Sequence, residues 1–158
     1  MKPLKLYLET SVWNFYYADD APEKKVVTHQ FYENLSANEF EIYISQVVLA
    51  EFADASVDKQ KLLEILVNQY QPINLPDSKE ARELAMSYLS NEVLPKKSNV
   101  DALHIAFATV YNMDAIVSWN MRHIANLRRQ KAVQAINLLN GYSTPLQLIS
   151  PLEVIYGT

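Results

Sequence analysis

The chain contains no cysteine and only two glycines, and each scarcity excludes common kinds of functional site. Without cysteine there is no disulfide, no thiolate zinc site and no cysteine nucleophile. The glycines are Gly141 and Gly157, so the chain has no glycine-rich phosphate loop of the P-loop or dinucleotide-binding type. Phosphate chemistry would therefore have to use a metal ion or cationic side chains.

An excess of positive charge is also lacking. Fourteen Lys and Arg residues stand against 18 Asp and Glu residues, which gives a formal net charge of −4 and a pI near 5.3. This balance argues against an overall basic nucleic-acid binder. A polyanionic ligand would need a local basic patch, or a metal ion between it and the protein.

Long hydrophobic runs are absent as well. The first residues, MKPLKLYLETSV, lack the apolar core of a signal peptide, and no stretch is apolar enough to span a bilayer. We therefore expect no membrane association and a cytoplasmic location. With 158 residues, 49% of them hydrophobic, the chain is expected to form a single domain covering residues 1–158.

The pattern of hydrophobic residues predicts strands that alternate with helices. Strands are expected at residues 4–8, 40–44, 73–75, 115–118 and 146–149. A helix is expected from Asp20, an acidic cap before Pro22, to residue 35, and others at residues 46–55 and from Asp58 to before Pro72. Asp77 or Ser78 is expected to cap a helix that extends to residue 89, and two more are expected at residues 99–111 and 129–139. Such alternation predicts an α/β fold of three layers, α/β/α, with a mainly parallel central sheet.

Four polar residues stand where a ligand site of such a sheet forms. Glu9 directly follows one predicted strand and Asn120 comes two residues after another, whereas Glu51 and Asp101 lie in predicted helices. Each has a simpler interpretation: Glu9 as a helix cap, Glu51 on a solvated face, and Asp101 as a partner of a helix dipole worth roughly 0.3–1 kcal/mol. Three converging carboxylates would repel one another, and a hard divalent cation removes that conflict. Oxygen ligands alone favour Mg²⁺ or Mn²⁺ over zinc.

Four segments of the sequence resemble the PIN-domain family. They are LYLETSVWNF, SQVVLAEF, DALHIAFATVYNMDAIVSWNMRHI and AINLLNGYSTPLQLISP. Together they extend the likeness over nearly the whole chain, and they are most similar to small prokaryotic members encoded as toxins of toxin–antitoxin pairs. The order of strand-end acid, helical Glu, DALH and SWN is specific in combination.

The resemblance implies a parallel sheet between helices and an Mg²⁺- or Mn²⁺-dependent endoribonuclease. The family's acidic site residues correspond to Glu9, Glu51 and Asp101, with Asn120 at the usual position of a fourth acid. The resemblance also implies an RNA rather than a DNA substrate, an antitoxin partner and a homodimer. In the hypothesis that follows, the three acids hold a metal ion that polarises the scissile phosphate and activates a water.

The sequence departs from the family pattern at two positions. Glu9 stands where Asp is commoner, and Asn120 replaces an acid, so the site would carry a carboxylate charge of −3 rather than −4. Thr10 or Ser11 matches the family's hydroxyl residue and would order the carboxylates by hydrogen bonds. We expect metal binding, and we retain as an alternative a catalytically weakened PIN-like module that binds RNA or protein.

The basic residues are concentrated on both sides of the predicted site. The candidate RNA contacts are Arg122, His123, Arg128, Arg129 and Lys131, with Lys96 and Lys97 before the Asp101 helix. An ordinary solvated helix face explains the same residues. His104 and His123 are candidates for proton transfer or for a structural role. The aromatic residues near the site, Trp13, Tyr16, Tyr17 and Trp119, serve either base stacking or packing.

Overall fold

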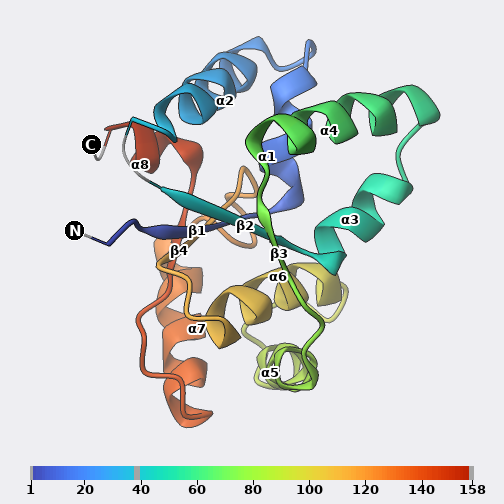
Figure 1. The fold of residues 1–158 in the computed structure, drawn as a ribbon. Helices are drawn as coiled ribbons and strands as arrows, with labels where there is room; N and C mark the ends of the chain where they lie inside the picture. The colour runs from blue at the N-terminus through green and yellow to red at the C-terminus, as the bar shows by residue number, and fades with distance from the viewer. Residues whose placement is uncertain (1, 38–39, 157–158) are drawn as a thin grey trace.

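Five short parallel strands form the centre of the computed structural model, which describes residues 2–37 and 40–156 (Figure 1). The strands are β1 (Lys5–Leu8), β2 (Glu41–Ser45), β3 (Ile73–Leu75), β4 (Ala115–Val117) and β5 (Gln147–Ile149). Every neighbouring pair is parallel. The predicted α/β class with a parallel sheet is confirmed.

The strand order β3-β2-β1-β4-β5 creates a switch point beside β1. The chain builds the sheet outward from β1 through β2 to β3, and then returns to place β4 on the other side of β1. Leu6 pairs with Ile42 of β2 and with Ala115 of β4. The crossover connections therefore leave β1 and β4 in opposite directions, and ligands of open parallel sheets bind at the carboxyl ends of such a strand pair.

Helices cover both faces of the sheet, as the continuous burial of the strands requires (Figure 1). One layer contains α1 (Thr10–Asn14), α2 (Pro22–Asn34), α4 (Val57–Tyr70) and α8 (Pro151–Tyr156). The opposite layer contains α5 (Lys79–Ser90), α6 (Asn99–Val110) and α7 (Leu127–Leu139). Two further short elements are the 3₁₀ helix η1 (Phe15–Tyr17) and α3 (Gln46–Ala53), which directly follows β2. The core lies between these layers and the sheet.

Most helix boundaries follow from side-chain caps. Ser45 Oγ accepts a hydrogen bond from Val47 N at the start of α3, and Ser78 Oγ accepts one from Ala81 N at the start of α5. The helix expected at Arg129 begins two residues earlier, because Asn126 caps it by accepting from Arg129 N. Gly141 has a φ of +88°, as expected for the glycine after a helix end.

The sequence prediction misplaced the first residue of two helices and missed two short ones. The expected acidic cap at Asp20 is absent, since Ala21 occupies the cap position and makes no side-chain cap bond, and Asp19 pairs with Lys25 instead. The helix expected from Asp58 begins at Val57, behind the cap Ser56. Neither α1 nor α8 was predicted, because five or six residues are too few for a hydrophobic period to be recognised.

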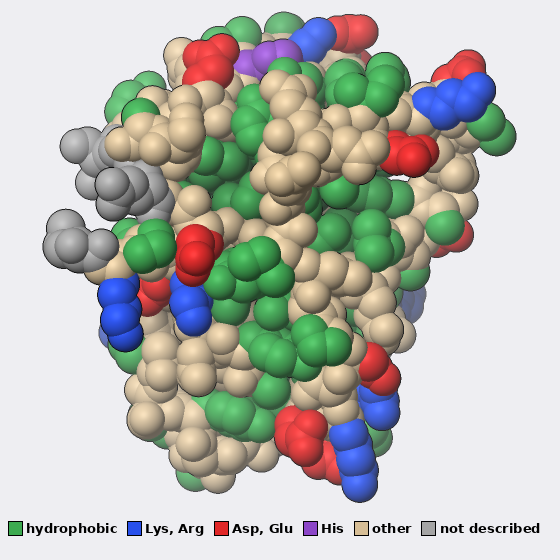
Figure 2. Space-filling model, in the orientation of Figure 1, with side chains coloured by type: hydrophobic (Ala, Val, Ile, Leu, Met, Phe, Trp, Pro, Cys, Tyr) green, Lys and Arg blue, Asp and Glu red, His purple; other side chains and the backbone are tan. Residues whose placement is uncertain are grey.

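The surface in Figure 2 has hydrophobic side chains toward its middle and charged side chains mainly toward its rim. Several exposed hydrophobic residues belong to α4, namely Val57, Leu62 and Ile65. Within the part of the chain that the structure describes, no helix combines the length and the apolar character needed to cross a membrane.

A backbone substitution tests the end of α4. Gln71 ends this helix with a φ of 48° and a ψ of 58°, in the left-handed region that costs L-residues energy and costs glycine none. We expect Gln71→Gly to raise the free energy of unfolding by about 0.5–1 kcal/mol, measured by urea denaturation. The control Gln69→Gly, within the same helix, should lower it by about 1 kcal/mol. A loss of stability in Gln71→Gly would contradict this account.

Candidate functional site

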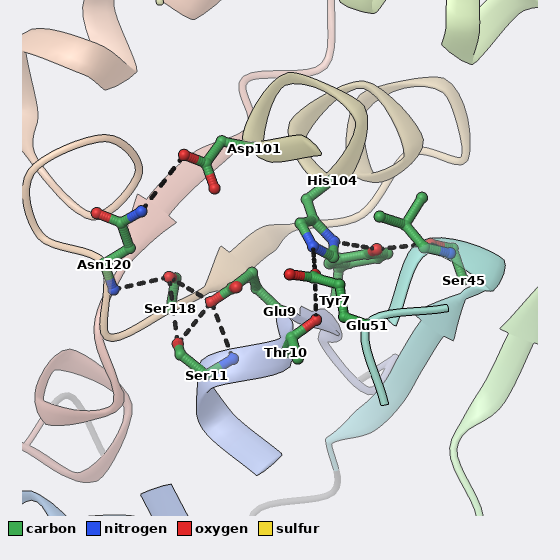
Figure 3. Close-up of polar contacts among 11 residues, drawn as sticks. Tyr7, Glu9, Thr10, Ser11, Ser45, Glu51, Asp101, His104, Ser118 and Asn120 are labelled. Carbon is green, nitrogen blue, oxygen red and sulfur yellow. Dashed lines mark hydrogen bonds and ion pairs between the residues drawn. The ribbon is translucent and has the colours of Figure 1, made fainter. Parts of the chain in front are cut away.

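Glu9 lies at the switch point, directly after β1, with its side chain buried. Its Oε1 accepts three hydrogen bonds: from Ser11 N at 3.2 Å, from Ser11 Oγ at 2.5 Å and from Ser118 Oγ at 2.7 Å (Figure 3). Ser11 Oγ in turn accepts a bond from Trp119 N at 2.8 Å. Glu9 is therefore the cap of α1 and also the residue through which α1 is joined to the segment after β4.

Glu51 reaches the same region from α3. Its Oε1 accepts hydrogen bonds from Thr10 Oγ1 and from His104 Nε2, both at 2.6 Å (Figure 3). Burial raises the pKa of Glu51, but the hydrogen bond and charge of His104 and the hydrogen bond of Thr10 act more strongly together and hold that pKa below its ordinary value. Glu51 is thus an ionised carboxylate at neutral pH.

A chain of buried hydrogen bonds fixes the position of Glu51. Tyr7 OH lies 2.7 Å from His104 Nδ1 and 2.7 Å from Ser45 Oγ, and all three of these side chains are buried. Because ionised Glu51 can only accept, His104 Nε2 must carry a proton. When the ring is neutral, Nδ1 accepts from the Tyr7 hydroxyl and Tyr7 accepts from Ser45; when the ring is charged, Nδ1 donates to Tyr7 and Tyr7 donates to Ser45. Burial raises the Tyr7 pKa, which keeps its hydroxyl protonated as this chain requires.

Asp101 and Asn120 face each other on the other side of the site (Figure 3). Asp101 Oδ2 lies 3.4 Å from Asn120 Nδ2 and 3.2 Å from His123 Nδ1. Asn120 Oδ1 accepts from His123 N at 3.0 Å, and its backbone N donates to Ser118 Oγ at 2.9 Å. The amide of Asn120 therefore donates toward Asp101, while its oxygen is used to order the loop.

One group of three side chains is close enough to share a metal ion. In the described ranges, Glu9, Glu51 and His104 each offer a ligand atom within 4.8 Å of the other two. Ligands on opposite sides of an Mg²⁺ ion are about 4.2 Å apart, since each bond is about 2.1 Å long. Small movements would suffice, and the two carboxylates of this group suit a hard cation. Asp101, which the sequence analysis placed among the ligands, lies outside this close group.

His104 is better suited to hold Glu51 than to bind a metal ion itself. Its side chain is fully buried, and both ring nitrogens already have partners, Glu51 at Nε2 and Tyr7 at Nδ1. The carboxylates differ in this respect. All of their hydrogen bonds from described residues go to Oε1, which leaves Oε2 of Glu9 and of Glu51 available to a ligand.

The remaining predicted residues are distributed unevenly. Arg122, Arg128 and Lys131 are exposed, whereas His123 and Arg129 are partly buried. Trp13 is enclosed in the core, and Trp119 is buried with its Nε1 donating to Thr28 Oγ1 at 2.9 Å, so both serve packing.

Sequence reasoning overlooked Ser118, Tyr7 and Ser45. Ser118 had a detectable signal, since it ends the predicted AIVS strand, but Asn120 was the residue predicted at that strand end. Tyr7 and Ser45 lie inside or at the end of apolar strands, where nothing in the sequence distinguishes a bonded hydroxyl from a packed one.

No family model matches the sequence, and no curated protein matches it. The structure is similar to a chain in the crystal structure of VapBC2 from Rickettsia felis bound to a DNA fragment from their promoter. The TM-score is 0.56 and the sequence identity 21%, over 75% of this chain and 90% of that chain. The similarity shows a PIN-like fold.

A stability measurement tests the buried chain behind Glu51. We expect Tyr7→Phe to lower the free energy of unfolding by about 1–3 kcal/mol, because His104 and Ser45 each lose a buried partner. Tyr111→Phe is the matched control, since it removes a hydroxyl that donates to Pro76 O in an exposed setting, and it should cost less than about 1 kcal/mol. Equal losses in urea denaturation would show that the chain contributes nothing particular.

Proposed function

We propose that this PIN-like chain is an Mg²⁺- or Mn²⁺-dependent ribonuclease that hydrolyses RNA phosphodiesters, and that it is the toxin of a toxin–antitoxin pair. The observation that carries the proposal is the meeting of Glu9 and Glu51 at the switch point, each with one oxygen held by the protein and one left for a ligand. A pair of carboxylates held this close is suited to a hard divalent cation.

Different residues of the chain would bind the metal ion and orient its ligands. Glu9 and Glu51 would hold the metal ion, and Asp101 would contribute directly or through a water. When bound, the ion supplies charge stabilisation at the phosphate and lowers the pKa of a water. Ser11, Thr10 and Ser118 keep the carboxylates oriented by their hydroxyl groups. His104 donates to Glu51 from behind, which preserves its ionised form.

The hydrogen bonds of Asn120 argue for one bound metal ion rather than two. A second ion would need a ligand where the family has its fourth acid, but the Asn120 oxygen is bonded to His123 N and its amide group faces Asp101. The same observation favours the second candidate function, a catalytically weakened PIN-like module that binds RNA or protein. The two functions differ in whether RNA is cut.

The proposed partners are an antitoxin protein and a second copy of the chain, with action in the cytoplasm. The structural neighbour is a VapBC2 complex, and exposed hydrophobic residues such as Val57 and Ile65 on α4 are suited to a protein partner. The expectation that the protein has no DNA ligand conflicts with this structural neighbour, because the VapBC2 complex is bound to a DNA fragment from their promoter. The proposal therefore leaves DNA open as a ligand of a complex, with RNA as the substrate.

Metal binding is tested by thermal melting. At about 100 times its dissociation constant, Mn²⁺ should add ~2.7 kcal/mol of stability and raise the melting temperature of the wild type by about 5–10 °C. Glu9→Gln and Glu51→Gln should abolish this Mn²⁺-induced rise, whatever their own melting temperatures. Asp54→Asn removes an exposed acid after the same helix as Glu51 and should keep the full rise. An unchanged rise in both Gln variants would refute the metal site.

Cleavage of a labelled single-stranded RNA in Mn²⁺ distinguishes the two candidate functions. We expect Asp101→Asn to slow cleavage roughly 10–100-fold, because it removes the third acid of the site. Asn120→Asp should accelerate cleavage by restoring the fourth acid. If neither the wild type nor Asn120→Asp cuts RNA while both bind Mn²⁺, the binding module is the correct function.

A further inference from the structure

Arg129 is a cation with an unsatisfied buried donor. It lies in the first turn of α7, and its Nε is buried without a hydrogen-bond partner among the described residues. Its guanidinium also forms no ion pair within residues 2–37 and 40–156. Buried polar atoms are nearly always bonded, so a group left without a partner needs an explanation. The terminal guanidinium nitrogens are not among the buried atoms, and in the described residues no carboxylate pairs with them, so an anionic ligand could bind there.

Arg129 lines a surface pocket. The pocket has a volume of about 400 Å³ and is lined by Leu89, Glu92, Leu94, Pro95, Lys96 and Arg129. Lys96 brings a second positive charge from the turn that precedes α6. The volume exceeds what a phosphate needs and leaves room for an attached ribose.

The pocket adjoins the carboxylate site through Asp101. The turn that lines it leads directly into α6, where Ser98 N donates to Pro95 O at 2.8 Å and Asp101 occupies the first turn. Burial lowers the pKa of Arg129, while the charge of Asp101 acts in the opposite direction, as a nearby carboxylate does. Asp101 makes no ion pair with Arg129, because its Oδ2 is directed to His123 and Asn120.

We propose that Arg129 and Lys96 form a seat for a backbone phosphate of single-stranded RNA, next to the nucleotide held at Asp101. This inference rests on the proposed function, and it adds where the substrate strand runs: from the carboxylates across the first turn of α7 to the turn before α6. A guanidinium suits a phosphate because it offers several N–H donors in one plane. Contacts of this kind position a strand without selecting its sequence.

Glu92 provides a second test of the seat, because its substitution should strengthen RNA binding rather than weaken it. Glu92 lines the same pocket as Arg129 and Lys96, and its carboxylate forms no ion pair with either in the described part of the chain. A carboxylate beside a bound phosphate weakens binding by repulsion of like charges. Removing the charge of Glu92 should therefore strengthen RNA binding.

The test measures RNA affinity without cleavage. A short fluorescently labelled single-stranded RNA is titrated with the protein in EDTA, at several salt concentrations. We expect Arg129→Met to weaken binding about tenfold at low salt, and to make the slope of log K against log salt shallower by about 0.7, as for one lost phosphate contact. Glu92→Gln should tighten binding. Lys61→Met, which removes an exposed charge on α4 in the opposite helix layer, should change neither quantity.

Melting temperatures separate a ligand contact from a structural role. Arg129→Met removes an unsatisfied buried N–H and keeps the apolar stem, so its melting temperature should stay the same or rise. A lower melting temperature of Arg129→Met would indicate that Arg129 has a structural role. The Glu92→Gln variant, which leaves Arg129 intact, then decides: tighter RNA binding supports the seat, and unchanged binding overturns it.

The outcomes also distinguish this inference from the proposed function. The seat is overturned if Arg129→Met binds RNA like Lys61→Met, or if the wild type does not bind RNA in EDTA. The nuclease proposal fails alone if the wild type binds RNA through Arg129 but cuts none in Mn²⁺. Cleavage by the wild type with no effect of Arg129→Met on binding removes the seat and leaves the nuclease.

Discussion

Repulsion between Glu9 and Glu51 is the constraint around which this end of the sheet is organised. Two carboxylates this close are stable only with compensating donors, and the chain supplies five hydrogen bonds to them, from Ser11 N, Ser11 Oγ, Ser118 Oγ, Thr10 Oγ1 and His104 Nε2. These donors come from α1, from α6 and from the segment after β4. The same bonds that neutralise the repulsion therefore join helices of both layers to the centre of the sheet.

The distribution of these hydrogen bonds determines which carboxylate oxygens are available to a ligand. Because both carboxylates use Oε1 for the protein, their second oxygens have no internal partner among the described residues, and the site is ordered before any ligand arrives. Asn120 contributes differently, since its amide bonds to Asp101 and to the loop and adds no negative charge. Charge of the opposite sign lies nearby on Arg129 and Lys96, so the acidic average of the chain is a poor guide to the local field. In physiological salt, exposed charges act over about 8 Å, and local arrangement matters more than the total.

The order of strands and helices could be predicted because it depends on local patterns. Apolar runs end at polar residues in β1, β2 and β4, and caps such as Ser45 and Ser78 stand directly before their helices. The prediction failed where local rules competed. Asp20 is a residue type that commonly caps helices. However, α2 begins at Pro22, which places Ala21 at the cap position, and the neighbouring Asp19 forms an ion pair with Lys25.

By itself the sequence determined the fold class, the parallel sheet, and the placing of Glu9 at the end of a central strand, because hydrophobic periods and strand ends are properties of neighbouring residues. Only the tertiary structure decided that Glu9, Glu51 and His104 form one close group without Asp101. It also decided that a buried chain from Tyr7 through His104 supports Glu51, and that Ser118 bonds to Glu9. The hydrogen-bonded partners in these contacts are separated by 53 to 109 residues. Their distances depend on how each helix rotates against the sheet, and packing across the whole core sets that rotation.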